Sequence, residues 1–158
     1  MRVTVAIEPE DSPAGLEMPW TATETGERFY DLRENKQDIE RIEPARSHPP
    51  LRNFLSLLNG GETAFTTLKA RVIAAQSDAG DKDNCEFSSC VALVFAQPQL
   101  NFGRGHYEGL LDNLRELLEK DAAPDVLRVE LRARRCYYHA EDRLGYALEC
   151  LLAARGAS

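Results

Sequence analysis

The sequence contains no long hydrophobic stretch. No window approaches the about 18 apolar residues that a membrane-spanning helix needs. The first ten residues, MRVTVAIEPE, hold a single arginine and an apolar run too short for a secretory signal peptide. These absences disfavour a helical membrane protein and a secreted one, and we expect a soluble, cytoplasmic protein that does not bind membranes.

Basic residues are in the minority. The chain has 19 Lys+Arg against 26 Asp+Glu and a formal net charge of -7. A charge of this sign disfavours broad binding to nucleic acids. The acidity is concentrated early, because residues 1–62 hold 7 basic and 12 acidic residues, whereas residues 63–158 hold 12 and 14. We therefore expect an acidic face on the N-terminal part of the protein.

Cysteine and histidine are scarce and widely spaced. The chain has four cysteines and three histidines: Cys85, Cys90, Cys136, Cys150, His48, His106 and His139. They form neither a C-x-x-C pair nor the usual zinc spacing, and the acidic loop around Asp81 departs from the EF-hand pattern, so we expect no metal and no cofactor. Cys136 and His139 are the nearest thiol and imidazole. Three positions apart on a strand, they would point to opposite faces, so no catalytic residue is predicted.

Residues 1–47 are rich in proline and loop-like. Their two apolar runs, residues 3–7 and 28–32, predict peripheral strands joined by loops. Trp20, the only tryptophan, lies in this segment. We expect it to fold back over the edge of the core, the alternative being an exposed aromatic side chain that marks a contact site.

Residues 48–158 show clear helical and strand patterns. Prolines before and glycines after a run of helical spacing predict a short helix over residues 51–58. Alternation predicts strands over residues 64–75, 85–96 and 126–139, of which the second is apolar on both faces and therefore central. A long amphipathic helix should lie on the sheet. Its apolar stripe consists of Tyr107, Leu110, Leu111, Leu114, Leu117 and Leu118.

The last segment, residues 145–155, fits either a helix or a strand. Its alanine, leucine and glutamate favour a helix, whereas its alternation favours a strand that returns by a hairpin, and we expect the strand. In such a hairpin, the buried residues are odd-numbered in the first strand and even-numbered in the second. The two buried faces therefore coincide only if the numbers of directly opposed residues add to an odd number. Cys136 and Cys150 add to an even number, so Cys136 should point outward, Cys150 inward, and no disulfide should join them.

Together these patterns predict a single α+β domain over residues 1–158. A mainly antiparallel sheet with a ββαββ-like core carries one long amphipathic helix on one face, plus a short helix and N-terminal peripheral strands. Residues 1–47 form a loop-rich, acidic peripheral segment, and residues 48–158 form the α+β core.

The loop before the long helix is a candidate anion-binding site. Gly103, Arg104, Gly105 and His106 lie between a strand and a helix, the order in which backbone N–H groups and the helix dipole hold phosphate. The glycine spacing is not that of a dinucleotide-binding loop, and no Ser, Thr or Asp caps the helix. Arg104 and His106 are therefore candidates for holding a small anion or a partner. The alternative is that the glycines only let the chain turn.

The predicted strand over residues 126–139 carries a second candidate. Arg128, Arg132 and Arg134 share its outward face, with Tyr138 at the end. Guanidinium groups hold carboxylates or phosphates, and Tyr138 could stack on a ligand. The alternative is a solvated sheet face whose arginines form salt bridges with Glu149 and the acidic N-terminal segment.

These observations predict a non-catalytic binding or regulatory module, such as an acidic immunity- or inhibitor-type protein that docks on a basic protein partner. Two alternatives remain open. One is a small-anion-binding domain or an enzyme that uses Arg104, His106 and the arginine face of Arg128, Arg132 and Arg134. The other is a self-associating structural domain that buries a sheet face or an apolar edge in a homodimer.

Overall fold

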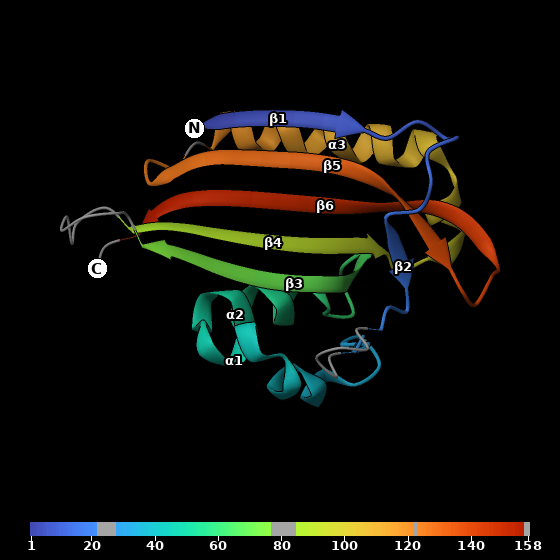
Figure 1. Cartoon of the computed structure of the whole chain (residues 1–158), viewed down its shortest axis with the longest axis horizontal. Helices are drawn as coiled ribbons and strands as arrows, with labels where there is room; N and C mark the ends of the chain where they lie inside the picture. Colours follow the sequence, from blue (N-terminus) through green and yellow to red (C-terminus); the bar gives the residue numbers. More distant parts are fainter. Residues whose placement is uncertain (22–27, 77–84, 122, 157–158) are drawn as a thin grey trace.

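The computed structural model describes residues 1–21, 28–76, 85–121 and 123–156. These residues fold into an α+β structure around a mixed sheet of six strands (Figure 1). The strands are β1 (Arg2–Ile7), β2 (Leu16–Met18), β3 (Phe65–Gln76), β4 (Cys85–Phe95), β5 (Val126–Tyr138) and β6 (Arg143–Gly156). Their order is β1-β5-β6-β4-β3, and β2 lies beside β5 beyond the end of β1. The acidic loop around Asp81 lies outside the described residues.

Strand directions are mixed. The long strands β3, β4, β5 and β6 are antiparallel to one another where they pair, whereas β1 and β2 run parallel to β5. The strand interpretation of the last segment is confirmed by β6. Because β1 and β2 belong to the sheet, the N-terminal segment contributes strands to the sheet as well as peripheral loops.

The predicted strand over residues 28–32 is wrong. A single bridge joins Thr21 and Arg28, and no strand follows it. Leu32 is only 2% exposed and packs with Ile39 and Leu55. This apolar run therefore anchors a loop to the helices instead of pairing with a strand.

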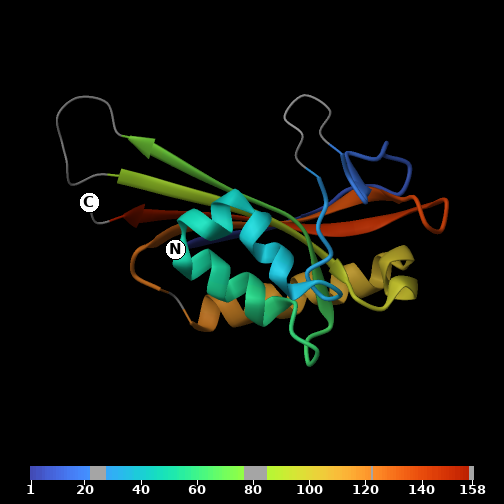
Figure 2. The same cartoon turned by 90° about the horizontal axis from the view of Figure 1, so that it is seen from below.

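The α-helices lie on one face of the sheet (Figure 2). They are α1 (Glu43–Ser47), α2 (Pro49–Leu58) and α3 (Arg104–Lys120), and the 3-10 turns η1 (Lys36–Arg41) and η2 (Pro98–Phe102) precede α1 and α3. Prolines occupy the first positions of α2. Proline is tolerated there because the backbone N–H groups of the first helical turn have no hydrogen-bond partner within the helix. Within the described residues, no helix is long and apolar enough to cross a membrane.

The largest hydrophobic cluster lies between α3 and the sheet. Tyr107 and Leu111 are buried there against Val129 and Leu148. The predicted apolar stripe of the helix packs on this cluster except at Leu117, whose side chain is 61% exposed. By helical spacing, Leu117 lies at the margin of the stripe, on the side of the helix nearer to solvent.

The opposite face of the sheet is covered where β5 ends. Leu16, Met18 and Trp20 pack there over Cys136 and Tyr138. The prediction that Cys136 points outward has the correct face but the wrong environment, because the N-terminal segment buries the side chain completely. Trp20 folds back over the core edge, as expected, and is half-buried.

The hairpin of β5 and β6 has the predicted register. Leu131 faces Cys150 and Cys136 faces Gly145, so opposed numbers add to an odd number. Cys136 and Cys150 accordingly lie on opposite faces and are both free. The prediction that no disulfide joins them is confirmed.

Candidate functional site

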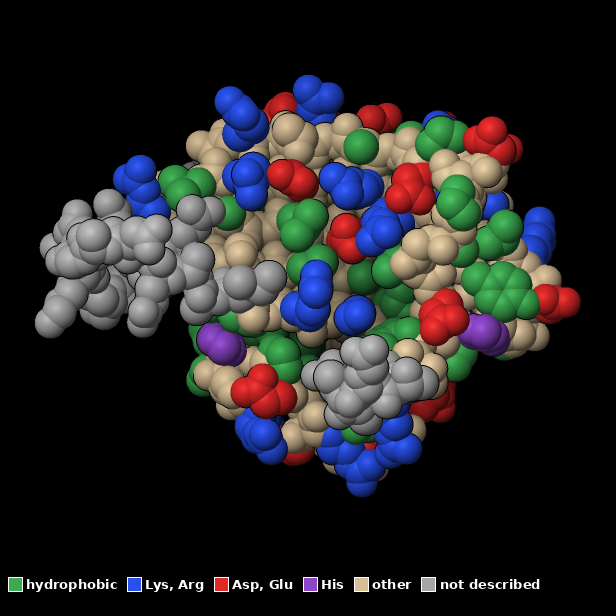
Figure 3. Space-filling model, in the orientation of Figure 1, with side chains coloured by type: hydrophobic (Ala, Val, Ile, Leu, Met, Phe, Trp, Pro, Cys, Tyr) green, Lys and Arg blue, Asp and Glu red, His purple; other side chains and the backbone are tan. Residues whose placement is uncertain are grey.

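The predicted arginine face pairs with the protein's own carboxylates. Arg128 and Arg132 approach the same residue, Glu130, at 3.2 and 3.9 Å. Arg134 contacts Glu8 at 3.3 Å and Glu149 at 3.1 Å, and both contacts are partly buried. Basic and acidic side chains are interspersed over this face of the sheet (Figure 3). Glu149 and Glu8, in the N-terminal segment, are partners that the solvated-face alternative named, whereas Glu130 on the same strand was not among them.

The predicted site at the start of α3 is also occupied by internal contacts. The Arg104 guanidinium donates to Glu108 Oε1 at 2.7 Å, to the backbone oxygen of Glu8 at 3.1 Å and to the Tyr146 hydroxyl at 3.4 Å. Hydrogen bonds to Glu108 and Tyr146 raise the pKa of Arg104. His106 is exposed, and its ring lies so close to Gly103 that a Cβ there would meet it at 2.6 Å. Arg104 thus holds the protein's own groups.

The two predicted sites meet at Glu8, which follows β1. Its backbone oxygen accepts from Arg104 and from Tyr146, on the helix-covered side of the sheet. Its carboxylate accepts from Arg134 and from the backbone N–H of Arg135, on the other side. The two arginines approach one residue from opposite faces, so they fasten the end of β1 instead of lining one ligand site.

Tyr138 is not available for stacking on a ligand. Its side chain is 4% exposed, its hydroxyl donates to the Tyr146 backbone oxygen at 2.5 Å and its ring lies edge-on to Phe102. Burial raises the pKa of this hydroxyl well above its usual range. The expectation that Tyr138 ends an exposed face is wrong, because β2 and Trp20 cover this part of the sheet.

The described thiols are held in their protonated form. Burial raises the pKa of Cys136 and of Cys150 to about 12, and it raises the pKa of Cys90 as well. Thiolates, not thiols, are the nucleophiles in cysteine-dependent catalysis.

His139 lies 3.1 Å from Glu17. Among the described residues, no group of His, Cys, Asp and Glu is arranged to hold a metal ion.

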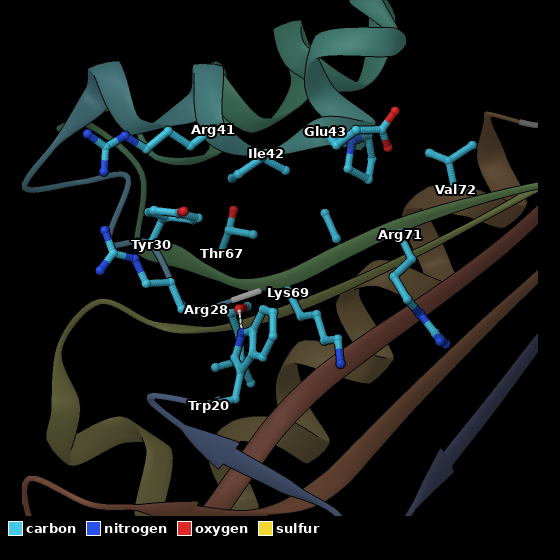
Figure 4. A pocket seen from close by; sticks show the side chains of 13 residues that line it. Trp20, Arg28, Tyr30, Arg41, Ile42, Glu43, Thr67, Lys69, Arg71 and Val72 are labelled. Carbon is cyan, nitrogen blue, oxygen red and sulfur yellow. Dashed lines mark hydrogen bonds between the residues drawn. The ribbon is translucent and has the colours of Figure 1, made fainter. Parts of the chain in front are cut away.

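A cleft of about 420 Å³ runs along the outer edge of β3 (Figure 4). Six consecutive residues of the strand line it, from Thr67 to Val72. Since successive side chains of a strand point to opposite faces, six in a row line one hollow only where it follows the strand's edge. We call this hollow the β3-edge cleft. Its other lining residues are Trp20, Arg28, Tyr30, Arg41, Ile42, Glu43 and Pro44.

Trp20 forms one wall of the β3-edge cleft. Its ring N–H donates to the Leu68 backbone oxygen at 2.7 Å, and Lys69 Nζ lies 4.6 Å from the ring centroid. The pairing of β3 with β4 shifts between Thr67 and Lys69, which makes Leu68 an extra, bulged residue. The bulge and the indole together close this end of the strand edge.

The opposite wall comes from the start of α1. In Figure 4, Ile42 lies between the helix and the strand and the Glu43 carboxylate points away from the strand, whereas Lys69 and Arg71 extend to the other side of the strand. Arg28 lies over the ring of Tyr30 at 5.3 Å. The strand edge is therefore flanked on one side by residues 41–44 before and at the start of α1, and on the other by Lys69, Arg71 and the indole ring of Trp20.

The β3-edge cleft is basic although the chain is acidic. Four of its side chains are cationic and one is acidic: Arg28, Arg41, Lys69, Arg71 and Glu43. Arg41 contacts Asp38 at 3.6 Å. Within the described part of the chain, no carboxylate lies within 4 Å of the charged groups of Arg28, Lys69 or Arg71. In that part of the chain, Arg28, Lys69 and Arg71 therefore have no acidic partner, whereas the side chains of the predicted arginine face do.

The sequence patterns did not predict this cleft. Lys69 and Arg71 stand two positions apart in the predicted strand over residues 64–75, which otherwise consists of apolar residues and threonine, and that is the signal they leave in the sequence. Their value as a site depends on β3 being the edge strand. Strand order is set by long-range pairing, which alternation within one strand does not reveal.

A second hollow, of about 500 Å³, lies between α2 and the helix-covered face of the sheet. Its lining is apolar apart from His48 and Ser89 and includes Phe54, whose side chain is 47% exposed. Leu57, one turn further along α2, is 74% exposed. This surface carries apolar contact area but little polar chemistry.

No family model matches the chain, and neither the curated proteins nor the solved structures compared with it give a match. The proposals that follow therefore rest on the geometry and charges of this chain.

Proposed function

We propose that the protein is a binding module that holds an anionic segment of a partner protein in the β3-edge cleft. The observation that carries the proposal is the grouping of Arg28, Lys69 and Arg71 beside two aromatic rings, with no carboxylate partner among the described residues. Guanidinium and ammonium groups in a cleft bind carboxylates and phosphates through charge-assisted hydrogen bonds.

The composition of the chain strengthens this argument. The chain has 26 acidic and 19 basic residues, so it contains enough carboxylates for each cation to pair with one inside the protein. The fold does supply partners to Arg104, Arg128, Arg132 and Arg134. A cleft that keeps a net positive lining in such a chain attracts an anion from outside.

The proposal keeps the predicted class of function and changes the expected partner. An acidic protein was expected to dock on a basic partner, whereas the β3-edge cleft is complementary to an acidic one. The raised pKa values of Cys136 and Cys150 favour a binding module over a cysteine-dependent enzyme, because both thiols stay protonated near neutral pH.

The test is a titration with acidic peptides that uses Trp20 as the reporter. Trp20 is the only tryptophan and lines the cleft, so its emission reports on this site. A set of capped nine-residue peptides rich in Glu should give a saturable change that weakens with added salt. Lys69→Gln and Arg71→Gln should each weaken binding about two- to fivefold, as expected for partly exposed ion pairs.

Arg128→Gln is the matched control, because it removes the same charge from the same sheet face on another strand. It should leave the titration unchanged. An equal loss with Arg128→Gln would move the site to the predicted arginine face. Binding of Lys-rich peptides with no binding of Glu-rich ones would restore the basic partner.

A second candidate function is self-association through α2. The exposed side chains of Phe54 and Leu57 beside the second hollow favour it, because adjoining exposed apolar side chains often mark an interface. Sedimentation over a range of concentrations should then show a dimer that Leu57→Glu dissociates. A monomer at all concentrations would remove this candidate.

A further inference from the structure

We propose that the bound segment adds to the sheet as a strand beside β3, and that its sequence alternates acidic and apolar residues. The inference rests on the proposed function and specifies its partner. An added strand would form backbone hydrogen bonds to β3, while its side chains would be selected by the two walls of the cleft.

Within the described part of the chain, the edge of β3 keeps backbone groups without a partner, as strand addition requires. Alternate residues of an edge strand turn their N–H and C=O groups outward. The Leu68 backbone oxygen is one outward group, because it accepts the Trp20 N–H across the cleft. By the two-residue repeat, the next outward groups belong to Ala70 and Val72, and both residues line the cleft.

The side chains of β3 set the sequence that fits. Lys69 and Arg71 share one face of the sheet, about 7 Å apart along the strand. Ala70 lies on the other face, where it packs against the same hydrophobic cluster as Ile42. Directly opposed residues of neighbouring strands place their side chains on the same face. An added strand would thus set acids beside Lys69 and Arg71 and an apolar residue beside Ala70.

The length of the added strand is also limited. At one end, Leu68 is bulged and its backbone oxygen is already bonded to Trp20. The cleft reaches Val72 at the other end. A core of three residues in the order acid, apolar, acid therefore satisfies the site.

Strand edges with lysine and a bulge also occur as protection against unwanted pairing. The two explanations differ in what they predict for a bound peptide. Edge protection predicts that no backbone pairing forms, so that any acidic peptide would bind through its charges alone. Strand addition predicts that binding depends on the peptide's own N–H groups.

The experiment compares four capped nonapeptides by Trp20 emission and by calorimetry. One alternates Glu and Val, and one has the same composition with its Glu residues clustered. The other two repeat the alternating sequence with N-methyl groups either on the Val or on the Glu nitrogens. The alternating peptide should bind about tenfold more tightly than the clustered one, and one N-methylated peptide alone should lose binding.

The N-methylated pair also reports the direction of the added strand. In antiparallel addition, the residue opposite Ala70 turns its N–H toward β3, so N-methyl-Val blocks binding and N-methyl-Glu does not. In parallel addition the two peptides exchange roles. Binding should also slow hydrogen exchange at the Ala70 and Val72 amides but leave that at Lys69 and Arg71 unchanged.

Three results separate the two proposals. If the clustered and both N-methylated peptides bind as well as the alternating one, strand addition is wrong and the anionic site stands. If both N-methylated peptides lose binding equally, binding does not depend on the N–H groups along one edge of the peptide, and strand addition is also wrong. If no acidic peptide changes the Trp20 emission or gives heat, the proposed function fails together with this inference.

Discussion

Asn59 fastens the end of α2 to β3, and its removal should be among the most damaging single changes to the fold. The side chain is 3% exposed. Its amide nitrogen donates to the Leu55 backbone oxygen at 2.8 Å and to Thr67 Oγ1 at 2.7 Å, and its oxygen accepts the Thr67 backbone N–H at 2.9 Å. Asn59→Ala removes all three hydrogen bonds and leaves the Thr67 N–H buried and unpaired.

The expected loss follows from these three bonds. Each contributes a net of about 1 kcal/mol, and a buried N–H without a partner costs about 1–3 kcal/mol. We therefore expect Asn59→Ala to lower the free energy of unfolding by about 3–4 kcal/mol. For a chain of 158 residues this corresponds to a fall in Tm of about 10 °C.

Urea unfolding followed by circular dichroism and by Trp20 emission measures this loss. Thr67→Val is the control, because it removes the hydroxyl but keeps the backbone N–H and the side-chain volume, and it should cost about 1 kcal/mol. The double variant should lose less than the sum of the single losses by about 1 kcal/mol, since both variants break the bond to Thr67 Oγ1. A loss below about 1 kcal/mol for Asn59→Ala, or strict additivity, would refute this account of the junction.

Further predictions concern the thiols, Arg134 and Trp20. The pKa of Cys136 lies near 12 in the folded protein against 9.0 as the ordinary value, so its contribution to stability is complete below pH 9 and is lost as the pH rises toward 12. Urea unfolding between pH 8 and 11 should show this decline, and Cys136→Ala should make it shallower. Arg134→Met should lower stability by about 1–2 kcal/mol because it removes the ion pairs to Glu8 and Glu149, yet leave acidic-peptide affinity unchanged in the Trp20 titration. Trp20→Phe should cost about 1 kcal/mol in a dichroism melt, because it loses the bond to Leu68.

Local patterns predicted the elements that depend on local periodicity. The stripe of α3 and the two apolar faces of β4 are visible within single windows of sequence, and both elements form where expected. The prediction at residues 28–32 failed because an apolar run of that length is equally suited to anchoring a loop. Leu32 found partners on η1 and α2, and Leu55 on α2 lies too far along the chain for a local window around Leu32 to contain it.

The position of the open sheet edge could not be predicted from local sequence patterns, for a different reason. Alternation identifies a strand and its two faces, but it carries no information about neighbours. The position of β3 at the edge follows from β6 pairing with both β4 and β5, and from β1 occupying the other side of β5. Lys69 and Arg71 become a candidate site only once that order is known.

The two groups of basic residues differ in what an incoming anion has to displace. At Arg134, a ligand would compete with the carboxylates of Glu8 and Glu149, which the fold holds in place at effective concentrations in the millimolar range or above. At Lys69 and Arg71, a ligand displaces no described carboxylate. The fold therefore supplies carboxylates to Arg134 on β5 and, among the described residues, none to Lys69 and Arg71 on β3. For this reason the proposed site depends less on the number of arginines on a strand than on whether the described part of the fold supplies them with carboxylates.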